Sequence, residues 1–319
     1  MNILRSAEAM RADELDPIAQ KVADASARLH QIEDGTPEEA RAFRRQRGNP
    51  FAPNPIQLES IEEREIPISS GSLTIRIYRP FGWKEGSNTG FVFYHGGGFV
   101  LGDVEQYDTV VQHIAAKSRC IAISVEYLLA PDNKIKGIHR DGFDAYKWVR
   151  ENAEELGINS EKIAIGGDSA GGNLTIGVEL LCKKENYPTP IYEILIYPSV
   201  DLSMSYPSVE EFSTGYFLTK KSMSWFRSHY LETPEQAKDA ELLFLERDLQ
   251  GLSPAFVITA GFDPLRDEGK AFADSLVEHG VLVEHVCYAD MIHGFISFAG
   301  GIPAGMELIR EIAERLSQL

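Results

Sequence analysis

Residues 162–185 read KIAIGGDSAGGNLTIGVELLCKKE and carry the strongest structural signal in the chain. The stretch opens with a short apolar run rich in isoleucine, which is typical of a buried parallel strand. Further along, Leu174, Val178 and Leu181 recur at helical spacing, so a helix follows with almost no loop. The stretch therefore predicts a strand, a tight turn and a helix, with Ser169 at the corner.

The corner contains the pattern Gly-x-Ser-x-Gly, at Gly167, Ser169 and Gly171. So short a connection forces the corner residue into a strained backbone conformation, and glycines on both sides let neighbouring chain come close. This arrangement is typical of a nucleophile elbow. A phosphate-binding loop is the alternative, but the stretch lacks the lysine of a Walker loop and the order GxGxxG. The pattern favours a serine nucleophile.

Composition limits the class of protein. The chain has 319 residues, 43% of them hydrophobic, which suits one large α/β domain with a small appendage. Its 31 Lys and Arg stand against 48 Asp and Glu, giving a formal charge of −17. Such a charge opposes contact with nucleic acid phosphates or anionic lipid. We expect neither nucleic acid nor a membrane among its partners.

Cysteines and the N-terminus indicate the compartment. Three scattered cysteines suit buried, reduced thiols better than a disulfide framework or a zinc cluster. Residues 1–16 contain acidic side chains where a secretion signal needs a continuous apolar segment, and no apolar run has the length of a membrane span. We expect a cytoplasmic protein that binds no metal and needs no cofactor.

The order of the expected elements predicts the fold class. Asp16 and Thr36 each precede a proline and cap an expected helix, the second ending near Gly48. From Ile61 the pattern changes to a hairpin of strands, and strands then alternate with helices. This alternation predicts an α/β fold with a mainly parallel sheet covered on both faces. The strands expected after the hairpin are residues 91–94, 120–127, 162–166, 191–197, 255–260 and 281–288.

One long segment interrupts the alternation. Residues 198–253 contain polar turns and two expected helices, at 220–231 and 237–242, and are too long for a plain loop. We therefore divide the chain into an N-terminal helical part at 1–52, an α/β domain at 53–200 and 251–319, and a helical insertion at 201–250.

A serine nucleophile needs a base to accept its proton and an acid to orient that base. In parallel α/β sheets, functional residues gather at the carboxyl ends of the strands. Asp263 follows one expected strand and His293 follows the last one. The resulting order of Ser, Asp and His is that of the α/β-hydrolases.

Other residues compete for these two roles. His95 also follows a strand, but we interpret it as structural, because the three glycines after it can bring backbone beside the serine. Asp267 and Glu268 are better explained as charges at the N-terminus of the next helix. The other histidines fall on expected solvated helix faces (His30, His229 and His279) or in contexts without clear access to the elbow (His113, His139 and His285).

Attack on an acyl carbonyl places negative charge on its oxygen, which preplaced donors must stabilise. Gly97 and Gly98 of the sequence HGGG can offer backbone amides, and Ala170 offers another at the start of the helix. A merely flexible turn is the alternative for HGGG. A Gly-x-Ser-x-Gly elbow with a late Asp and His favours an oxyanion hole.

Four motifs, HGGGF at 95–99, GDSAGG at 167–172, GFDPLRDEG at 261–269 and IHGF at 292–295, resemble in order and spacing the bacterial hormone-sensitive-lipase family of esterases. The resemblance implies an α/β-hydrolase fold in which residues 1–52 and 201–250 join as a cap. It also implies the triad and the oxyanion donors, which are Ser169, Asp263, His293, Gly97, Gly98 and Ala170.

The resemblance implies a carboxylesterase for short to medium acyl chains, which works through an acyl-enzyme on Ser169 and often dimerises. Hydrolysis of amides, peptides or thioesters by the same triad stays open. So does a non-catalytic receptor for a small molecule, although the presence of His293 argues against it. Candidate pocket residues, for which core packing is the alternative, are Phe99, Phe212, Tyr216, Phe217 and Ile292.

Overall fold

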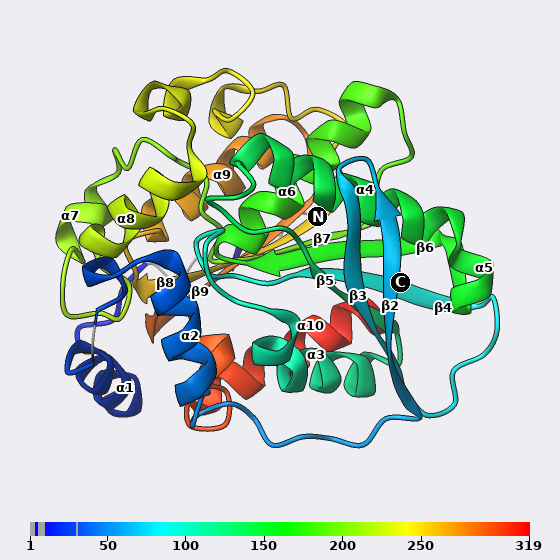
Figure 1. The fold of residues 1–319 in the computed structure, drawn as a ribbon, viewed down its shortest axis with the longest axis horizontal. Helices are drawn as coiled ribbons and strands as arrows, with labels where there is room; N and C mark the ends of the chain where they lie inside the picture. The colour runs from blue at the N-terminus through cyan, green and yellow to red at the C-terminus, as the bar shows by residue number, and fades with distance from the viewer. Residues whose placement is uncertain (1–3, 6–9, 30) are drawn as a thin grey trace.

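The computed structural model describes residues 4–5, 10–29 and 31–319. His30, expected on a solvated helix face, lies outside these residues, as does part of the acidic N-terminal stretch. Within them the chain forms one central sheet with helices on both sides (Figure 1).

In the described part of the chain, the sheet has nine strands in the order β1-β9-β8-β7-β6-β4-β5-β3-β2. Strands β2 and β3 form an antiparallel hairpin, β3 pairs antiparallel with β5, and the remaining neighbours are parallel. The predicted hairpin and mainly parallel sheet are confirmed. The strands are β1 Leu4–Arg5, β2 Ser60–Ile68, β3 Gly71–Arg79, β4 Asn88–Tyr94, β5 Ile121–Glu126, β6 Ile158–Asp168, β7 Glu193–Ile196, β8 Ala255–Phe262 and β9 Val283–Ile292.

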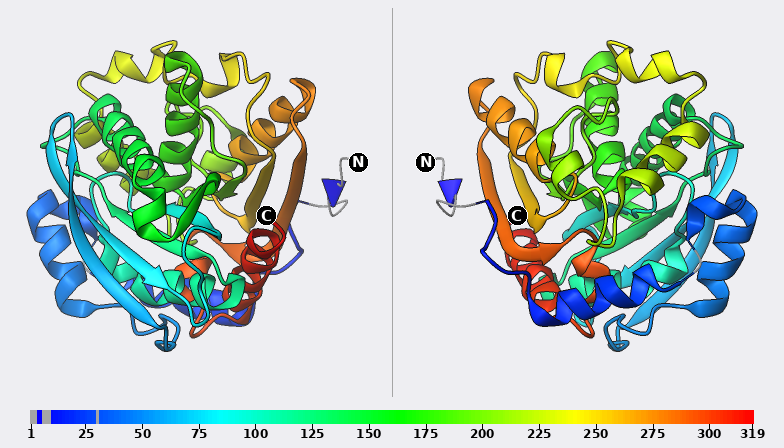
Figure 2. Two further views of the ribbon diagram at one scale, coloured as in Figure 1. Left: turned by 90° about the vertical axis from the view of Figure 1, so that its right-hand side faces the viewer. Right: turned by 90° about the vertical axis from the view of Figure 1, so that its left-hand side faces the viewer.

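Helices cover both faces of the sheet. Helices α3 and α10 lie on one face and α4, α6 and α9 on the other (Figure 1), while the hairpin and β9 mark opposite sides of the sheet (Figure 2). The α-helices are α1 Pro17–Ala27, α2 Pro37–Arg47, α3 Val104–Ser118, α4 Ile135–Glu151, α5 Ala153–Leu156, α6 Ala170–Glu185, α7 Pro207–Glu211, α8 Lys220–Tyr230, α9 Arg266–Glu278 and α10 Pro303–Ser317. The 3-10 helices are η1 Ile32–Asp34, η2 Pro234–Lys238, η3 Phe244–Glu246 and η4 Phe295–Phe298.

The alternation of side chains along β4 shows how the two layers of core arise. Phe91 and Phe93 belong to the cluster packed with α3 and α10, while Val92 and Tyr94 belong to the cluster packed with α4 and α6. All four side chains are fully buried. Neighbouring side chains of a strand point to opposite faces, so a continuous apolar strand supplies both layers.

Some expected elements differ from those observed. Helix α3, between the HGGG loop and β5, was not predicted, although Asp103 caps it and Val110, Val111 and Ile114 bury one face. The helix expected at 237–242 is instead the 3-10 helix η2 followed by a turn. Ala237 and Leu242 are buried there, but a segment this short is marginal as an α-helix.

Helices of the N-terminal part and of the insertion meet at one end of the sheet. Helices α2, α7 and α8 gather at the end to which β6 points (Figure 1), and Lys221 of α8 forms an ion pair with Asp34 of η1 at 2.8 Å. This end is where the loops that follow the parallel strands converge. None of the helices in the described ranges is long and apolar enough to cross a lipid bilayer.

Candidate active site

Ser169 stands at the sharp turn between β6 and α6. Its backbone angles, φ 57° and ψ −117°, are uncommon for a residue with a side chain, as the sequence predicted for the corner. A Cβ atom on Gly171 would lie 2.0 Å from the carbonyl oxygen of Tyr94, so only glycine fits there. The turn thus holds the serine clear of the sheet, with the start of α6 directly behind it.

The structure brings Ser169, His293 and Asp263 into one hydrogen-bonded chain. Nε2 of His293 lies 2.9 Å from Oγ of Ser169, and Nδ1 lies 2.7 Å from Oδ2 of Asp263. Asp263 follows β8 and His293 follows β9, and these strands are parallel neighbours, so their carboxyl ends place the two side chains together. The amide of Leu265 donates to the other Asp263 oxygen at 2.8 Å. Both carboxylate oxygens of Asp263 are therefore hydrogen-bonded.

The imidazole of His293 is also fixed by packing. It is 5% exposed, and its ring lies 4.7 Å from the ring of Tyr197, which follows β7. Asp263 is fully buried. A buried carboxylate and a packed imidazole lose little freedom when they act, because they are already ordered.

The HGGG loop presents two unused backbone donors. Gly97 and Gly98 have φ of 125° and 62°, which glycine adopts readily. Among the described residues, neither amide donates a hydrogen bond, and both residues line a cavity with Ser169. Ala170 is the first residue of α6, where amides have no acceptor inside the helix. The residues of the three expected oxyanion donors thus share cavity walls with Ser169.

His95 contacts the HGGG loop and makes no hydrogen bond with Ser169 among the described residues. It is fully buried, its Nδ1 lies 2.8 Å from the Gly96 carbonyl oxygen, and its ring stacks on that of Tyr127 at 4.4 Å. The hydroxyl of Tyr127 donates to the His95 carbonyl at 2.7 Å. These contacts fit the structural interpretation of His95.

Asp168 is a functional-site residue that the sequence reasoning missed. Its Oδ1 accepts the Gly96 amide at 2.7 Å, and its Oδ2 accepts the Tyr107 hydroxyl at 2.9 Å. Burial raises the pKa of Asp168, which these two hydrogen bonds partly oppose. Its place beside Ser169 in GDSAGG was the available signal.

Two acidic residues that competed with Asp263 occupy other positions. Asp267 pairs with Arg266 at 2.8 Å, in the first turn of α9. Glu268 is fully buried and accepts the amides of Val200 and Asp201 at 2.7 and 3.2 Å. Neither contacts His293 in the described part of the chain. Burial raises the pKa of Glu268 well above its usual value.

Two cavities meet at Ser169. The first, which we call the polar cavity, has a volume of about 140 Å³ and contains His293 and Gly97 in its wall. The second, the apolar cavity, is about 50 Å³ and includes Ala170 but not His293. Both share Gly98 and, from residues 201–250, Leu218 and Phe226. Other walls of the apolar cavity are Phe99, Ser199, Asp201, Met204, Met223, Tyr230 and Leu265. The carboxylate of Asp201 accepts hydrogen bonds from Ser203 and Ser205.

Only two of the five candidate pocket residues line these cavities. Phe99 lines the apolar cavity and Phe217 the polar one. Phe212 and Tyr216 instead pack on Phe262 at ring distances of 5.8 and 5.5 Å, and Ile292 is fully buried at the end of β9. These three side chains pack with the core beneath the site, which fits the alternative of core packing given for them.

Sequence comparison identifies the family. A family described as having the α/β-hydrolase fold matches residues 91–297. The matched part includes the HGGG loop, the elbow, Asp263 and His293. Within the described ranges, no three His, Cys, Asp or Glu side chains gather as a metal site. The chain belongs to this family, and the predicted fold and the resemblance to bacterial hormone-sensitive-lipase esterases are confirmed.

Curated relatives and solved structures extend the match over most of the chain. The carboxylic ester hydrolase LipN of Mycobacterium tuberculosis is 36% identical over 84% of this chain and 73% of its own. The carboxylesterase NlhH of the same species is 33% identical over 92% of each chain. A hyperthermophilic esterase from Pyrobaculum calidifontis matches with a TM-score of 0.88 at 34% identity, covering 96% of this chain and 98% of that one.

Proposed function

We propose that this protein is a carboxylesterase that hydrolyses esters of short to medium acyl chains through an acyl-enzyme on Ser169. The observation that carries the proposal is the hydrogen-bonded chain from Ser169 through His293 to buried Asp263. The named ester hydrolases among its relatives support the same reaction class.

Each step of the reaction has a residue suited to it. Oγ of Ser169 attacks the ester carbonyl while Nε2 of His293 accepts the hydroxyl proton. Asp263 stabilises the imidazole tautomer in which Nδ1 carries the proton. The amides of Gly97, Gly98 and Ala170 stabilise the oxyanion. As the tetrahedral intermediate collapses, the imidazolium protonates the leaving oxygen, which departs as the alcohol. The neutral imidazole then takes a proton from the water that attacks the acyl-enzyme and releases the acid and Ser169.

The shape of the two cavities suggests how an ester binds. The leaving oxygen must lie beside His293, whose side chain lines the polar cavity alone. We therefore assign the leaving group to the polar cavity and the acyl chain to the apolar cavity. Methionine and aromatic walls suit an alkyl chain, and the small volume of this cavity favours short ones.

Three further expectations are part of this proposal. Residues 1–52 and 201–250 form a cap, apart from β1, which pairs with β9 in the sheet. The ion pair between Lys221 and Asp34 and the place of Phe226 in the walls of both cavities support this assignment. A cytoplasmic location fits the three free thiols of Cys120, Cys182 and Cys287. A homodimer stays a prediction from the family resemblance.

Initial rates on p-nitrophenyl esters from acetyl to palmitoyl test the proposal, with Ser169→Ala measured in parallel. We expect rapid turnover that peaks at short chains and disappears in the variant. Turnover equal in both proteins, or none in either, would contradict the esterase and direct the search to amides, thioesters or ligand binding.

A further inference from the structure

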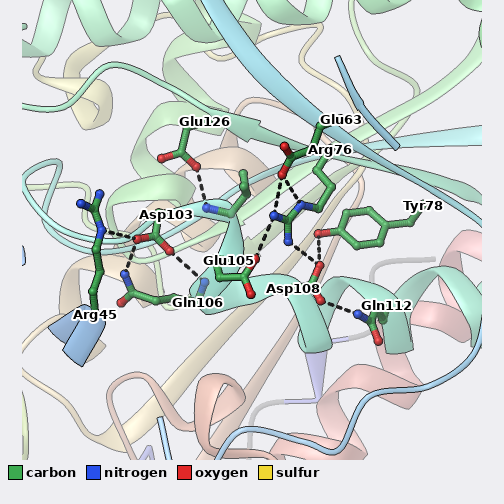
Figure 3. A network of polar contacts seen from close by, with 11 residues as sticks. Arg45, Glu63, Arg76, Tyr78, Asp103, Glu105, Gln106, Asp108, Gln112 and Glu126 are labelled. Atoms are coloured by element: carbon green, nitrogen blue, oxygen red, sulfur yellow. Dashed lines mark hydrogen bonds and ion pairs between the residues drawn. The ribbon is translucent and has the colours of Figure 1, made fainter. Parts of the chain in front are cut away.

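Helix α2 carries four arginines in its last two turns, and two of them join it to the rest of the fold. Arg41 donates through Nε to the carbonyl oxygen of Val100 at 2.8 Å and through its terminal nitrogen to that of Ala130. Arg45 pairs with Asp103 at 3.3 Å, beside the start of α3 (Figure 3). These two arginines therefore have structural partners.

The other two arginines line the polar cavity. Arg44 and Arg47 share its wall with Ser169 and His293. Within residues 4–5, 10–29 and 31–319, neither guanidinium forms an ion pair or a side-chain hydrogen bond. Arg44 is half-buried and Arg47 is exposed. The wall thus presents two cationic groups without direct partners to whatever occupies the cavity.

Carboxylates near Arg44 are already engaged. Asp168 accepts hydrogen bonds from the Gly96 amide and the Tyr107 hydroxyl, one on each oxygen. Asp103 accepts from Arg45 and from the amide and side chain of Gln106. Burial lowers the pKa of Arg44, and so does the charge of Arg47, while Tyr107, Asp103 and Asp168 only partly oppose this effect. A half-buried guanidinium without a direct anion is costly, and a ligand anion would remove that cost.

Simpler explanations do not account for this wall. Basic residues at the end of a helix interact favourably with its dipole, but this effect does not require two side chains in the cavity. A generally basic surface is also excluded as the cause, because the chain carries a formal charge of −17. The two arginines place positive charge on one part of the cavity wall, opposite in sign to the whole protein, and the buried Asp168 is the acidic residue that lines the same cavity.

We propose that the enzyme prefers esters whose leaving alcohol carries a carboxylate, which Arg44 binds and Arg47 attracts at the solvent side. This inference rests on the proposed esterase activity and names its substrate class. The anion belongs to the leaving group because His293, which must protonate the leaving oxygen, shares the polar cavity with both arginines. The planar guanidinium of Arg44 offers paired donors that match a carboxylate.

The test compares two acetate esters with similar leaving groups, 4-acetoxybenzoate and its neutral methyl ester. The quantity measured is the ratio of kcat/KM for the anionic ester to that for the neutral one, each rate corrected for spontaneous hydrolysis. We expect Arg44→Gln to lower this ratio on the order of tenfold to a hundredfold, since charge-assisted hydrogen bonds are lost. Added salt lowers the ratio of the unchanged enzyme, because it screens the attraction.

Further variants separate charge from geometry. Arg44→Lys keeps the positive charge but loses the planar pair of N–H donors, so we expect an intermediate ratio. Arg47→Gln lowers the ratio less, because Arg47 is exposed and its charge is screened by water. Arg28→Gln is the control: Arg28 is exposed at the end of α1 and lines neither cavity, so we expect the ratio to stay unchanged. Thermal unfolding of every variant verifies that each is folded.

The outcomes separate this inference from the proposed function. If the neutral ester is hydrolysed but neither Arg44 variant changes the ratio, the carboxylate preference is wrong and the esterase stands. A second pair of esters, 4-nitrophenyl hydrogen succinate and 4-nitrophenyl butyrate, places the carboxylate on the acyl side. If kcat/KM is raised by a carboxylate only in this pair, the leaving-group assignment is overturned. If the enzyme hydrolyses none of these esters, the proposed function fails and this inference with it.

Discussion

The carboxylate of Asp168 accepts the backbone amide of Gly96 at 2.7 Å and so joins the serine elbow to the HGGG loop. Asp168 immediately precedes Ser169, and Gly96 immediately precedes the glycines proposed as oxyanion donors. Tyr107 of α3 donates to the second oxygen of the same carboxylate. One side chain therefore connects the proposed nucleophile with the amides that would stabilise the charge it creates.

We expect Asp168→Ala to lower kcat about tenfold to a hundredfold on p-nitrophenyl acetate, with a smaller change in KM. Misplacing an oxyanion donor costs less than losing it, and loss of one donor costs roughly a hundredfold to a thousandfold. Asp168→Asn retains an acceptor for Gly96 and a donor for Tyr107, so it is the matched variant and keeps more activity. An unchanged kcat in Asp168→Ala would show that the loop holds its position without this carboxylate.

Asp263→Asn tests the proposed acid. An amide in place of the carboxylate favours the wrong imidazole tautomer, and we expect kcat to fall roughly ten-thousandfold. Asp267→Asn, four residues further on, removes an ion pair with Arg266 and leaves kcat within a few-fold. Steady-state rates of the two variants on one ester measure the difference. Similar losses in both would contradict the assignment of Asp263.

A pair of buried glutamates predicts a loss of stability at alkaline pH. Glu193 of β7 is fully buried, and burial raises its pKa, with a further rise from the nearby charge of Glu179. A carboxyl group whose pKa is raised in the folded state makes its full contribution to the free energy of unfolding below the unfolded pKa of 4.5. This contribution is lost as the pH rises through the folded-state pKa.

We therefore expect Glu193→Gln to be more stable than the natural protein at pH 9, by about 1 kcal/mol or more, and to differ less at pH 5. Urea unfolding at the two pH values measures this change. Exposed Glu278, mutated to Gln, is the control. Parallel stability curves for the Glu193 variant and the natural protein would contradict the prediction.

Thr36 begins α2, the helix that carries Arg44. Its hydroxyl accepts the Glu39 amide at 3.2 Å, and the Glu39 carboxylate accepts the Thr36 amide at 2.9 Å, forming a capping box. We expect Thr36→Ala to cost about 1 kcal/mol in the free energy of unfolding, and Thr36→Ser to cost a few tenths. Chemical denaturation compares the two. If Thr36→Ala were as stable as the natural protein, tertiary contacts alone would hold the start of α2.

Local signals in the sequence predicted much of the fold because they act over a few residues. The glycine spacing around Ser169 encodes a turn that only glycine flanks permit, and the capping patterns of Asp16 and Thr36 set two helix starts. Continuous apolar runs predicted buried strands. Helix α3 was missed, although its capping residue Asp103 and its apolar face were visible in the sequence.

Pocket residues were harder to predict, because a buried aromatic looks the same in a core and in a cavity wall. Phe212 and Phe217 lie five positions apart in one segment, yet Phe212 packs on Phe262 and Phe217 lines the polar cavity. Nothing in the spacing distinguishes them. Packing against distant segments determines whether each aromatic side chain lies in the core or in a cavity wall.

The sequence by itself determined the α/β class, the elbow and the order of the serine, acid and histidine, since strand ends and glycine turns are local features. Only the tertiary structure decided which side chains meet. It placed Asp263, rather than Asp267 or Glu268, 2.7 Å from His293. It also placed Arg44 and Arg47, more than a hundred residues before Ser169, in the wall of the same cavity. Packing between distant segments sets these contacts, and no local pattern encodes it.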